Sequence, residues 1–140
     1  MRSHCYTIPM AEPTIFTRII NGEIPCHKIY EDELVYAFLD INPVSRGHAL
    51  VIPRQEVDHL DDLDEETYTH LMSVVRKLSR HFKQVLKPQR IGLLVLGEEV
   101  PHAHVHIIPL FSLTEIRLNR AGSVPPSTEE LATIAESLRL

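Results

Sequence analysis

Three histidines occupy alternate positions in the segment PHAHVHIIP, residues 101–109. In an extended strand alternate side chains share one face, so His102, His104 and His106 are expected to line one side at spacings of about 6.7 Å. The apolar residues between them are expected to pack into the core. An imidazole has an unperturbed pKa of about 6.5, so its neutral ring nitrogen is a competent nucleophile near pH 7. The pattern favours nucleophilic catalysis by the central histidine, with the flanking histidines orienting it and handling protons.

Two other interpretations of these histidines stay open. The first is a half-exposed strand whose polar face is histidine and has no chemical role. The second is a metal site, because two histidines at i and i+2 can chelate zinc. The outer pair, His102 and His106, would lie about 13 Å apart in a strand and could not both reach one ion. A metal site would therefore need a ligand from elsewhere in the chain.

Length and composition are those of one ordinary globular domain. The 140 residues suffice for a hydrophobic core, and a formal net charge of −5 argues against nucleic-acid or membrane-surface partners. No apolar run approaches the roughly 20 residues that cross a bilayer, and the first residues lack a secretion-signal pattern. The two cysteines, Cys5 and Cys26, form no CxxC motif, so a reducing, cytoplasmic location is expected.

Apolar periodicity and turn residues predict an α+β fold. The expected elements are helices over 14–21 and 65–86, a final helix after the capping box Ser127–Glu130, and strands over 27–30, 34–40, 47–53, 90–96 and 102–110. Hairpin connections indicate an antiparallel sheet of about five strands with one long helix and one or two shorter ones. The final helix is expected to bury a stripe of Leu131, Ile134, Ala135 and Leu138.

Residues 1–13 are expected to form an N-terminal extension, disordered or lying partly upstream of a start at Met10. A single domain is expected over 14–110. A C-terminal extension over 111–140 would then carry the final helix.

Four segments resemble the histidine triad (HIT) superfamily of nucleotide hydrolases and transferases, in the order expected for that family. They are IFTRIINGEIP (15–25), YEDELVYAFLDINP (30–43), GHALVIP (47–53) and EVPHAHVHIIP (99–109). A lone HxHxH would be weak support, whereas four ordered segments with compatible spacing are strong. The resemblance implies a HIT-like fold and a homodimer in which two sheets join across the interface.

The resemblance also implies roles for four histidines. His104 would attack the α-phosphate of a nucleotide, giving a nucleotidyl-histidine intermediate that water hydrolyses. His102 would hold this nucleophile through its backbone carbonyl, which fixes the tautomer. His106 would contact the phosphate or the leaving-group oxygen, and His48 matches a fourth histidine on a neighbouring strand.

A nucleoside pocket follows from the same resemblance. Asp40 matches the position that binds the ribose hydroxyls. The walls that sandwich the base would be Phe16, Ile19, Phe38, Leu39 and Ile41, for which ordinary core packing is the alternative.

Two departures from the family pattern affect metal and phosphate binding. Some bacterial members hold a structural zinc with two cysteines, a histidine and the first triad histidine. Here Thr14, Thr17 and Glu56 stand at the first three positions, so neither a metal nor another cofactor is expected. The usual Gly-Gln-Ser/Thr before the triad is Gly97-Glu98-Glu99, and an ionised Glu99 can only accept hydrogen bonds.

Glu99 would therefore repel a phosphate, unless it serves as the acid for the leaving group. Arg46, beside Gly47, is a candidate additional phosphate contact, with a solvated loop arginine as the alternative. The predicted activity is hydrolysis of nucleoside monophosphate derivatives, of the purine nucleoside phosphoramidate type. Hydrolysis of dinucleoside polyphosphates, nucleotidyl transfer, and nucleotide-binding regulation with vestigial turnover are the alternatives.

Overall fold

The computed structural model describes residues 12–97, 99–112 and 124–140. Its elements are α1 (Ile15–Ile20), β1 (Lys28–Glu31), β2 (Val35–Leu39), β3 (Ala49–Pro53), the 3₁₀ turn η1 (Leu60–Asp62), α2 (Glu65–Leu86), β4 (Arg90–Leu94), β5 (Val105–Leu110) and α3 (Thr128–Leu138). The predicted α+β fold is confirmed. Cys5, Met10 and Glu98 lie outside the described residues, as do most of the predicted N-terminal extension and residues 113–123 of the C-terminal one.

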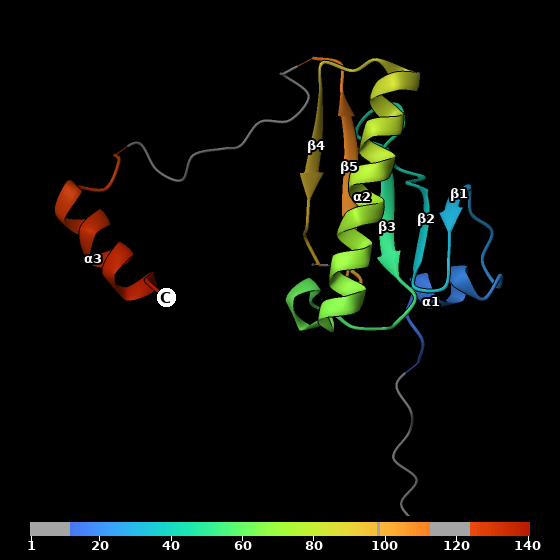
Figure 1. The fold of residues 1–140 in the computed structure, drawn as a ribbon, viewed down its shortest axis with the longest axis horizontal. Helices are drawn as coiled ribbons and strands as arrows, with labels where there is room; N and C mark the ends of the chain where they lie inside the picture. The colour runs from blue at the N-terminus through green and yellow to red at the C-terminus, as the bar shows by residue number, and fades with distance from the viewer. Residues whose placement is uncertain (1–11, 98, 113–123) are drawn as a thin grey trace, which may run out of the picture.

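The strands form one antiparallel sheet in the order β1-β2-β3-β5-β4, so β1 and β4 are its edges. The long helix α2 crosses one face of this sheet (Figure 1). Among the described residues, none of the helices is both long and apolar enough to cross a membrane.

The helix α2 has the bounds that its apolar periodicity predicts. Asp64 caps it by accepting a hydrogen bond from the Thr67 amide at 3.1 Å, and two glutamates in the first turn suit the helix dipole. It ends at Lys87, which adopts the left-handed conformation with φ 52° before Pro88.

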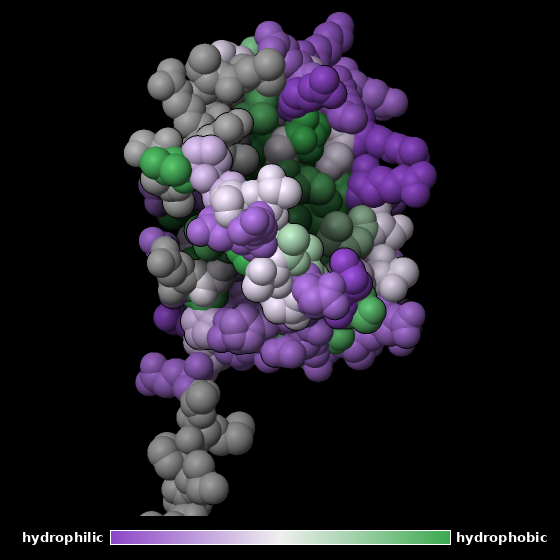
Figure 2. Space-filling view, turned by 90° about the vertical axis from the view of Figure 1, so that its left-hand side faces the viewer, coloured by the Kyte–Doolittle hydropathy of each residue, from purple (hydrophilic) through white to green (hydrophobic). Residues whose placement is uncertain are grey.

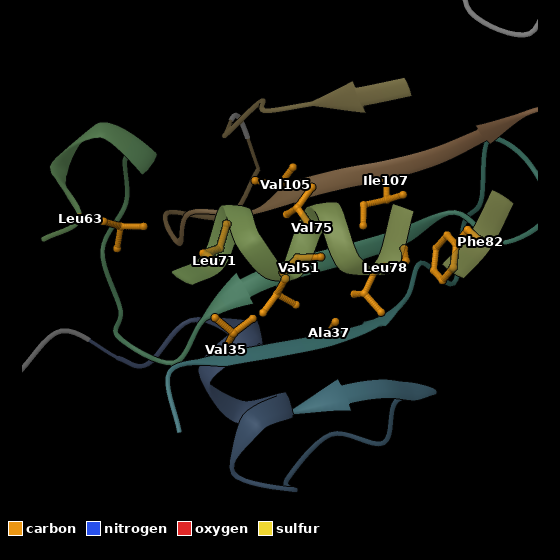
Figure 3. Packing of buried hydrophobic residues seen from close by; sticks show 12 residues of the cluster. Val35, Ala37, Val51, Leu63, Leu71, Val75, Leu78, Phe82, Val105 and Ile107 are labelled. Carbon is orange, nitrogen blue, oxygen red and sulfur yellow. The ribbon is translucent and has the colours of Figure 1, made fainter. Parts of the chain in front are cut away.

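Each face of the sheet carries a buried apolar cluster over its central strands. The face toward α2 packs an entirely apolar cluster that contains Val51 from β3, Val105 and Ile107 from β5, and Leu71 from the helix (Figure 3). On the other face α1 covers a second cluster, made of Phe16, Ile19, Tyr36, Phe38, Leu50 and Ile52. Strand alternation puts successive residues of β2 and β3 into the two clusters in turn, so every residue of β3 is buried.

The predicted strand over 102–110 is wrong at its start, because β5 begins only at Val105. The backbone before it bonds elsewhere: the His102 amide donates to the Val100 carbonyl at 2.8 Å, and the Ala103 amide donates to the Val57 carbonyl at 2.7 Å. His102 and His104 therefore lie in a loop that leads into the strand, and only His106 is a strand residue.

The final helix begins as predicted, since Ser127 and Glu130 form both bonds of the capping box. Its expected burial is wrong. Leu131, Ile134 and Leu138 are 52%, 49% and 74% exposed, and no residue of α3 is buried. Its apolar stripe therefore has no buried contact with the part of the chain that the structure describes.

Candidate active site

A cleft of about 480 Å³ lies on the face of the sheet opposite α2. Side chains from α1, from the end of β2 and from the loop before β5 line it. Ten of the residues expected at a nucleotide site meet there: Phe16, Ile19, Phe38, Leu39, Asp40, Ile41, His48, Glu99, His104 and His106. These positions span 91 residues of sequence and come together only through the sheet.

His104 is 6% exposed and is held in one tautomer. Its Nδ1 lies 2.7 Å from the His102 carbonyl oxygen, which can only accept a hydrogen bond. The proton of a neutral ring therefore sits on Nδ1, and Nε2 keeps its lone pair. The ring packs edge-on against Phe16 at 5.1 Å and against His106 at 5.0 Å between centroids.

His48 and His106 form a second oriented pair. The Val44 amide donates to Nδ1 of His48 at 3.0 Å, so the His48 proton sits on Nε2. That nitrogen lies 2.8 Å from Nδ1 of His106, to which it donates. His106 in turn carries its proton on Nε2. Two adjacent rings thus present complementary groups, a lone pair on His104 and an N–H donor on His106.

Burial keeps these imidazoles neutral. Burial first, and then the charge interactions with His104 and His48, lower the pKa of His106 to about 4, against the opposing charge of Asp40. Burial also lowers the pKa of His48, against the opposing charge of Asp40. Both rings are therefore neutral at neutral pH, each with one proton, as the hydrogen bond between them requires.

Asp40 lies at the end of β2, next to the histidine pair. Its Oδ1 accepts from the Asn42 amide at 2.8 Å, and its Oδ2 lies 3.6 Å from Nε2 of His48. One atom from each of Asp40, His48 and His106 lies within 4.8 Å of the others, which is the spacing of a three-ligand metal set. A metal there would have to replace the 2.8 Å hydrogen bond between the two histidines.

The apolar wall of the cleft is also part of the core. Phe16 and Phe38 are 8% and 5% exposed, and their rings meet edge-on at 5.7 Å. Ile19 is equally buried, whereas Ile41 is 79% exposed at the rim. The two interpretations of these residues are therefore compatible, because one side chain can pack in the core and still border the cleft.

Three predicted residues lie away from the cleft lining. His102 is fully buried beneath it, with its Nε2 donating to the Pro53 carbonyl at 2.8 Å. Arg46 and Gly97 are exposed loop residues that do not line the cleft. Glu99 does line it, although its side chain is exposed to solvent.

Several groups that shape the site carry no signal in the sequence. The Val44 amide sets the tautomer of His48, but a backbone donor is common to almost every residue. Leu94, Leu96 and Val100 complete the cleft lining from β4 and the loop after it. Only their apolar character could have drawn attention to them.

A family model described as "HIT domain" matches residues 21–113. The chain belongs to the HIT domain family. It is 35% identical over 130 residues to a protein of Schizosaccharomyces pombe named adenosine 5'-monophosphoramidase hnt1, covering 89% of this chain and 94% of that one.

Solved structures of HIT proteins have the same fold. A HIT family protein from Bacillus subtilis is similar with a TM-score of 0.81 and 33% identity, over 92% of this chain and 98% of that one. A histidine triad family protein from Mycobacterium smegmatis, described as zinc-bound, is similar with a TM-score of 0.68 and 28% identity, over 88% of this chain and 96% of that one.

Proposed function

We propose that this HIT protein hydrolyses nucleoside monophosphate derivatives, with purine nucleoside phosphoramidates as its substrates. One observation carries the proposal. The buried His104 has its proton fixed on Nδ1 by the His102 carbonyl, which leaves the Nε2 lone pair free in a cleft that Phe16, Phe38 and Asp40 border.

In the first step Nε2 of His104 attacks the α-phosphorus, and the bond from phosphorus to the leaving amine breaks. The amine takes up a proton from solvent as it leaves, and the nucleotide is held on His104. The Nε2–H of His106 donates to a phosphate oxygen or to the leaving group, because His48 occupies its other nitrogen. Water then attacks the phosphorus and gives up a proton to solvent, the bond to His104 breaks, and a nucleoside monophosphate is released.

The nucleoside would lie against the apolar wall. Phe16, Ile19 and Phe38 provide aromatic and aliphatic surface for a base, and Asp40 provides a carboxylate that can accept hydrogen bonds from ribose hydroxyls. The name of the similar Schizosaccharomyces pombe protein, an adenosine 5'-monophosphoramidase, supports an adenosine monophosphate moiety in the substrate.

Glu99 favours an amine over a polyphosphate as the leaving group. Its side chain lines the cleft, and the charge of a carboxylate there repels the additional phosphates of a dinucleoside polyphosphate. An amine that becomes protonated as it leaves meets no such repulsion. The same charge would also repel the α-phosphate and so slow turnover. It therefore favours the alternative of a nucleotide-binding regulator with vestigial turnover.

A substrate panel tests this proposal. We expect adenosine and guanosine phosphoramidates to be hydrolysed with a higher kcat/KM than diadenosine polyphosphates, and Glu99→Gln to reduce that preference. A preference for diadenosine polyphosphates in the parent would contradict the phosphoramidase proposal. Tight AMP binding with no turnover of any member would support the regulator instead.

We further propose that two copies associate through β4. This edge strand and the residues after it expose four consecutive apolar side chains, Leu93, Leu94, Val95 and Leu96, which are 44–55% exposed. The side of the molecule that carries β4 shows a hydrophobic area with a hydrophilic border (Figure 2). Unpaired apolar edges favour pairing with another strand. Sedimentation should show a dimer that Leu93→Lys weakens, and a monomeric parent at micromolar concentration would contradict this.

A further inference from the structure

The four residues at the family's zinc positions are joined here by hydrogen bonds. Thr14, Thr17, Glu56 and His102 come from three distant segments, and we name them the Thr14 clasp. Glu56 accepts from the Thr14 amide at 2.8 Å and from the Thr17 hydroxyl at 3.1 Å. The Thr14 hydroxyl lies 2.8 Å from Nδ1 of His102. Thr14 and His102 are 9% and 0% exposed, so this bond is shielded from water.

The protons in the clasp can be placed one by one. Nε2 of His102 faces the Pro53 carbonyl at 2.8 Å and must donate to it, so Nδ1 of the neutral ring accepts. The Thr14 hydroxyl therefore donates to His102. Its oxygen also accepts from the Thr17 amide at 3.2 Å, as the N-cap of α1. Thr14 thus uses both its donor and its acceptor, and burial lowers the pKa of His102, which keeps the ring neutral.

These bonds determine where the His102 carbonyl points. The ring is held on both nitrogens, and the backbone is held by the amide bonds to Val100 and Val57. The carbonyl between these constraints receives the Nδ1–H of His104 at 2.7 Å. In addition, α1 carries Phe16, whose ring packs edge-on against both His102 and His104.

We infer that Thr14, supported by Glu56, is a positioning residue for His104. Thr14 orients His102, so that the His102 carbonyl holds the proton of His104 on Nδ1. The lone pair on Nε2 of His104 is then free. Thr14 does not line the cleft, and its hydroxyl is bonded to His102, so it acts through His102. The kinetic part of this inference rests on the proposed function, whereas the effect on the tautomer of His104 does not.

The test is Thr14→Val, with Thr14→Ser as the variant that restores the hydroxyl. Thr67→Val is the matched control, because Thr67 is a buried threonine near the start of a helix, as Thr14 is, but is hydrogen-bonded to Asp64 instead of His102. We expect Thr14→Val to lower kcat about 10- to 100-fold with KM within about twofold, since misplacing a reacting group typically costs on this order. Thr14→Ser and Thr67→Val should keep kcat within about threefold of the parent, as neither changes the hydroxyl that faces His102.

A second readout does not depend on turnover. Two-dimensional ¹⁵N NMR of the imidazoles should show His104 protonated on Nδ1 alone in the parent, Thr14→Ser and Thr67→Val proteins. In Thr14→Val it should show exchange between tautomers. If Thr14→Val fails to fold, Glu56→Ala removes an exposed carboxylate and should shift kcat and the tautomer in the same direction by a smaller amount.

The outcomes separate the two hypotheses. A Thr14→Val protein with parental kcat and a single His104 tautomer would overturn the inference, as would an equal loss in Thr67→Val. If the parent hydrolyses no nucleotide phosphoramidate, the proposed function fails, and the tautomer measurement still decides the role of Thr14.

Discussion

The two faces of the sheet differ in what covers them and in the chemistry they bury. The α2 face is closed by a helix of 22 residues, and its buried cluster is entirely apolar. The opposite face is covered by α1, which has only six residues, and leaves a cleft of about 480 Å³. Buried or partly buried histidines border or underlie this cleft, each with hydrogen-bond partners.

The same strands serve both faces through alternation. In β5, Val105 and Ile107 pack toward α2, whereas His106 lies between them and lines the cleft. This arrangement separates two tasks. Burial on the α2 face contributes most of the stabilisation, because apolar area is removed from water without polar groups that need partners. The cleft face instead uses burial to fix protonation states. Substitutions on the two faces should therefore have different consequences.

The largest effect is expected for His104→Ala. Removing the nucleophile should lower kcat for adenosine phosphoramidate by at least about 10³-fold, because the covalent path is lost. AMP should still bind, since the contacts from Phe38 and Asp40 remain. His81→Ala, an exposed histidine on α2, is the control and should keep the parental rate. If His104→Ala hydrolysed the substrate at the parental rate, His104 would not be the nucleophile, and the cleft face would not carry the catalytic chemistry proposed for it.

Leu71→Ala should act on stability alone. Leu71 is fully buried on the α2 face, and truncating such a side chain typically lowers the free energy of unfolding by about 2–5 kcal/mol. Below its melting transition the variant should retain parental kcat. Urea denaturation combined with kinetics at 15 °C measures both quantities, and a tenfold lower kcat in the folded variant would show that the faces are coupled.

Lowering the pH should reduce the free energy of unfolding, and the histidines of the cleft face should contribute first. The folded pKa of His106 is lowered to about 4, so between pH 6.5 and 4 the unfolded chain binds a proton that the folded chain does not. The stabilisation is complete above pH 6.5 and falls as pH decreases through this window, by roughly 1–3 kcal/mol for His106. His48 and His102, whose pKa values burial also lowers, add to the same slope.

Denaturation at a series of pH values measures this slope. His106→Gln should make it shallower. Carboxylates contribute mainly at lower pH: although burial opposes the shift, hydrogen bonds from His70, Tyr30 and two backbone amides hold the pKa of Asp32 well below its usual range. Constant stability from pH 6.5 to 4.5 would contradict the assignment of neutral, buried imidazoles.

His48→Phe should have the smallest effect of the four. It removes the donor that fixes the tautomer of His106 while keeping a ring of similar shape. One hydrogen bond contributes about 1 kcal/mol, so we expect a fall in kcat of about tenfold, and a lower melting temperature because the bonds to Val44 and His106 are both lost. Steady-state kinetics measures this. An unchanged kcat would mean that the N–H donor of His106 does not depend on His48.

The α2 face could be predicted from sequence more fully than the cleft face. The helix over 65–86 has its predicted bounds because a long apolar period and both end signals agree locally. The predicted start of β5 is wrong because the His102 amide bonds to Val100 and the Ala103 amide bonds to Val57, and periodicity does not show a distant partner such as Val57. The predicted burial of the apolar stripe of α3 is wrong for a related reason. An amphipathic pattern shows that a helix has an apolar face, but it does not identify a surface that covers this face.

The sequence also indicates which residue types form the cleft, but it does not indicate the protonation states or tautomers of the histidines. Spacing identified His104 and His106, and the family resemblance added His48 and Asp40. The proton positions depend on the Val44 amide and the His102 carbonyl, which are backbone groups without a sequence signal. The Thr14 clasp required three segments to be placed in space.

The most direct test of the central claim is to trap the intermediate. Parent protein mixed with adenosine phosphoramidate, quenched in milliseconds and digested, should yield one peptide that carries an added AMP on His104, identified by mass spectrometry. The intermediate should form and decay at rates compatible with turnover. Turnover with no adduct at any time, or an adduct on another residue, would contradict the account.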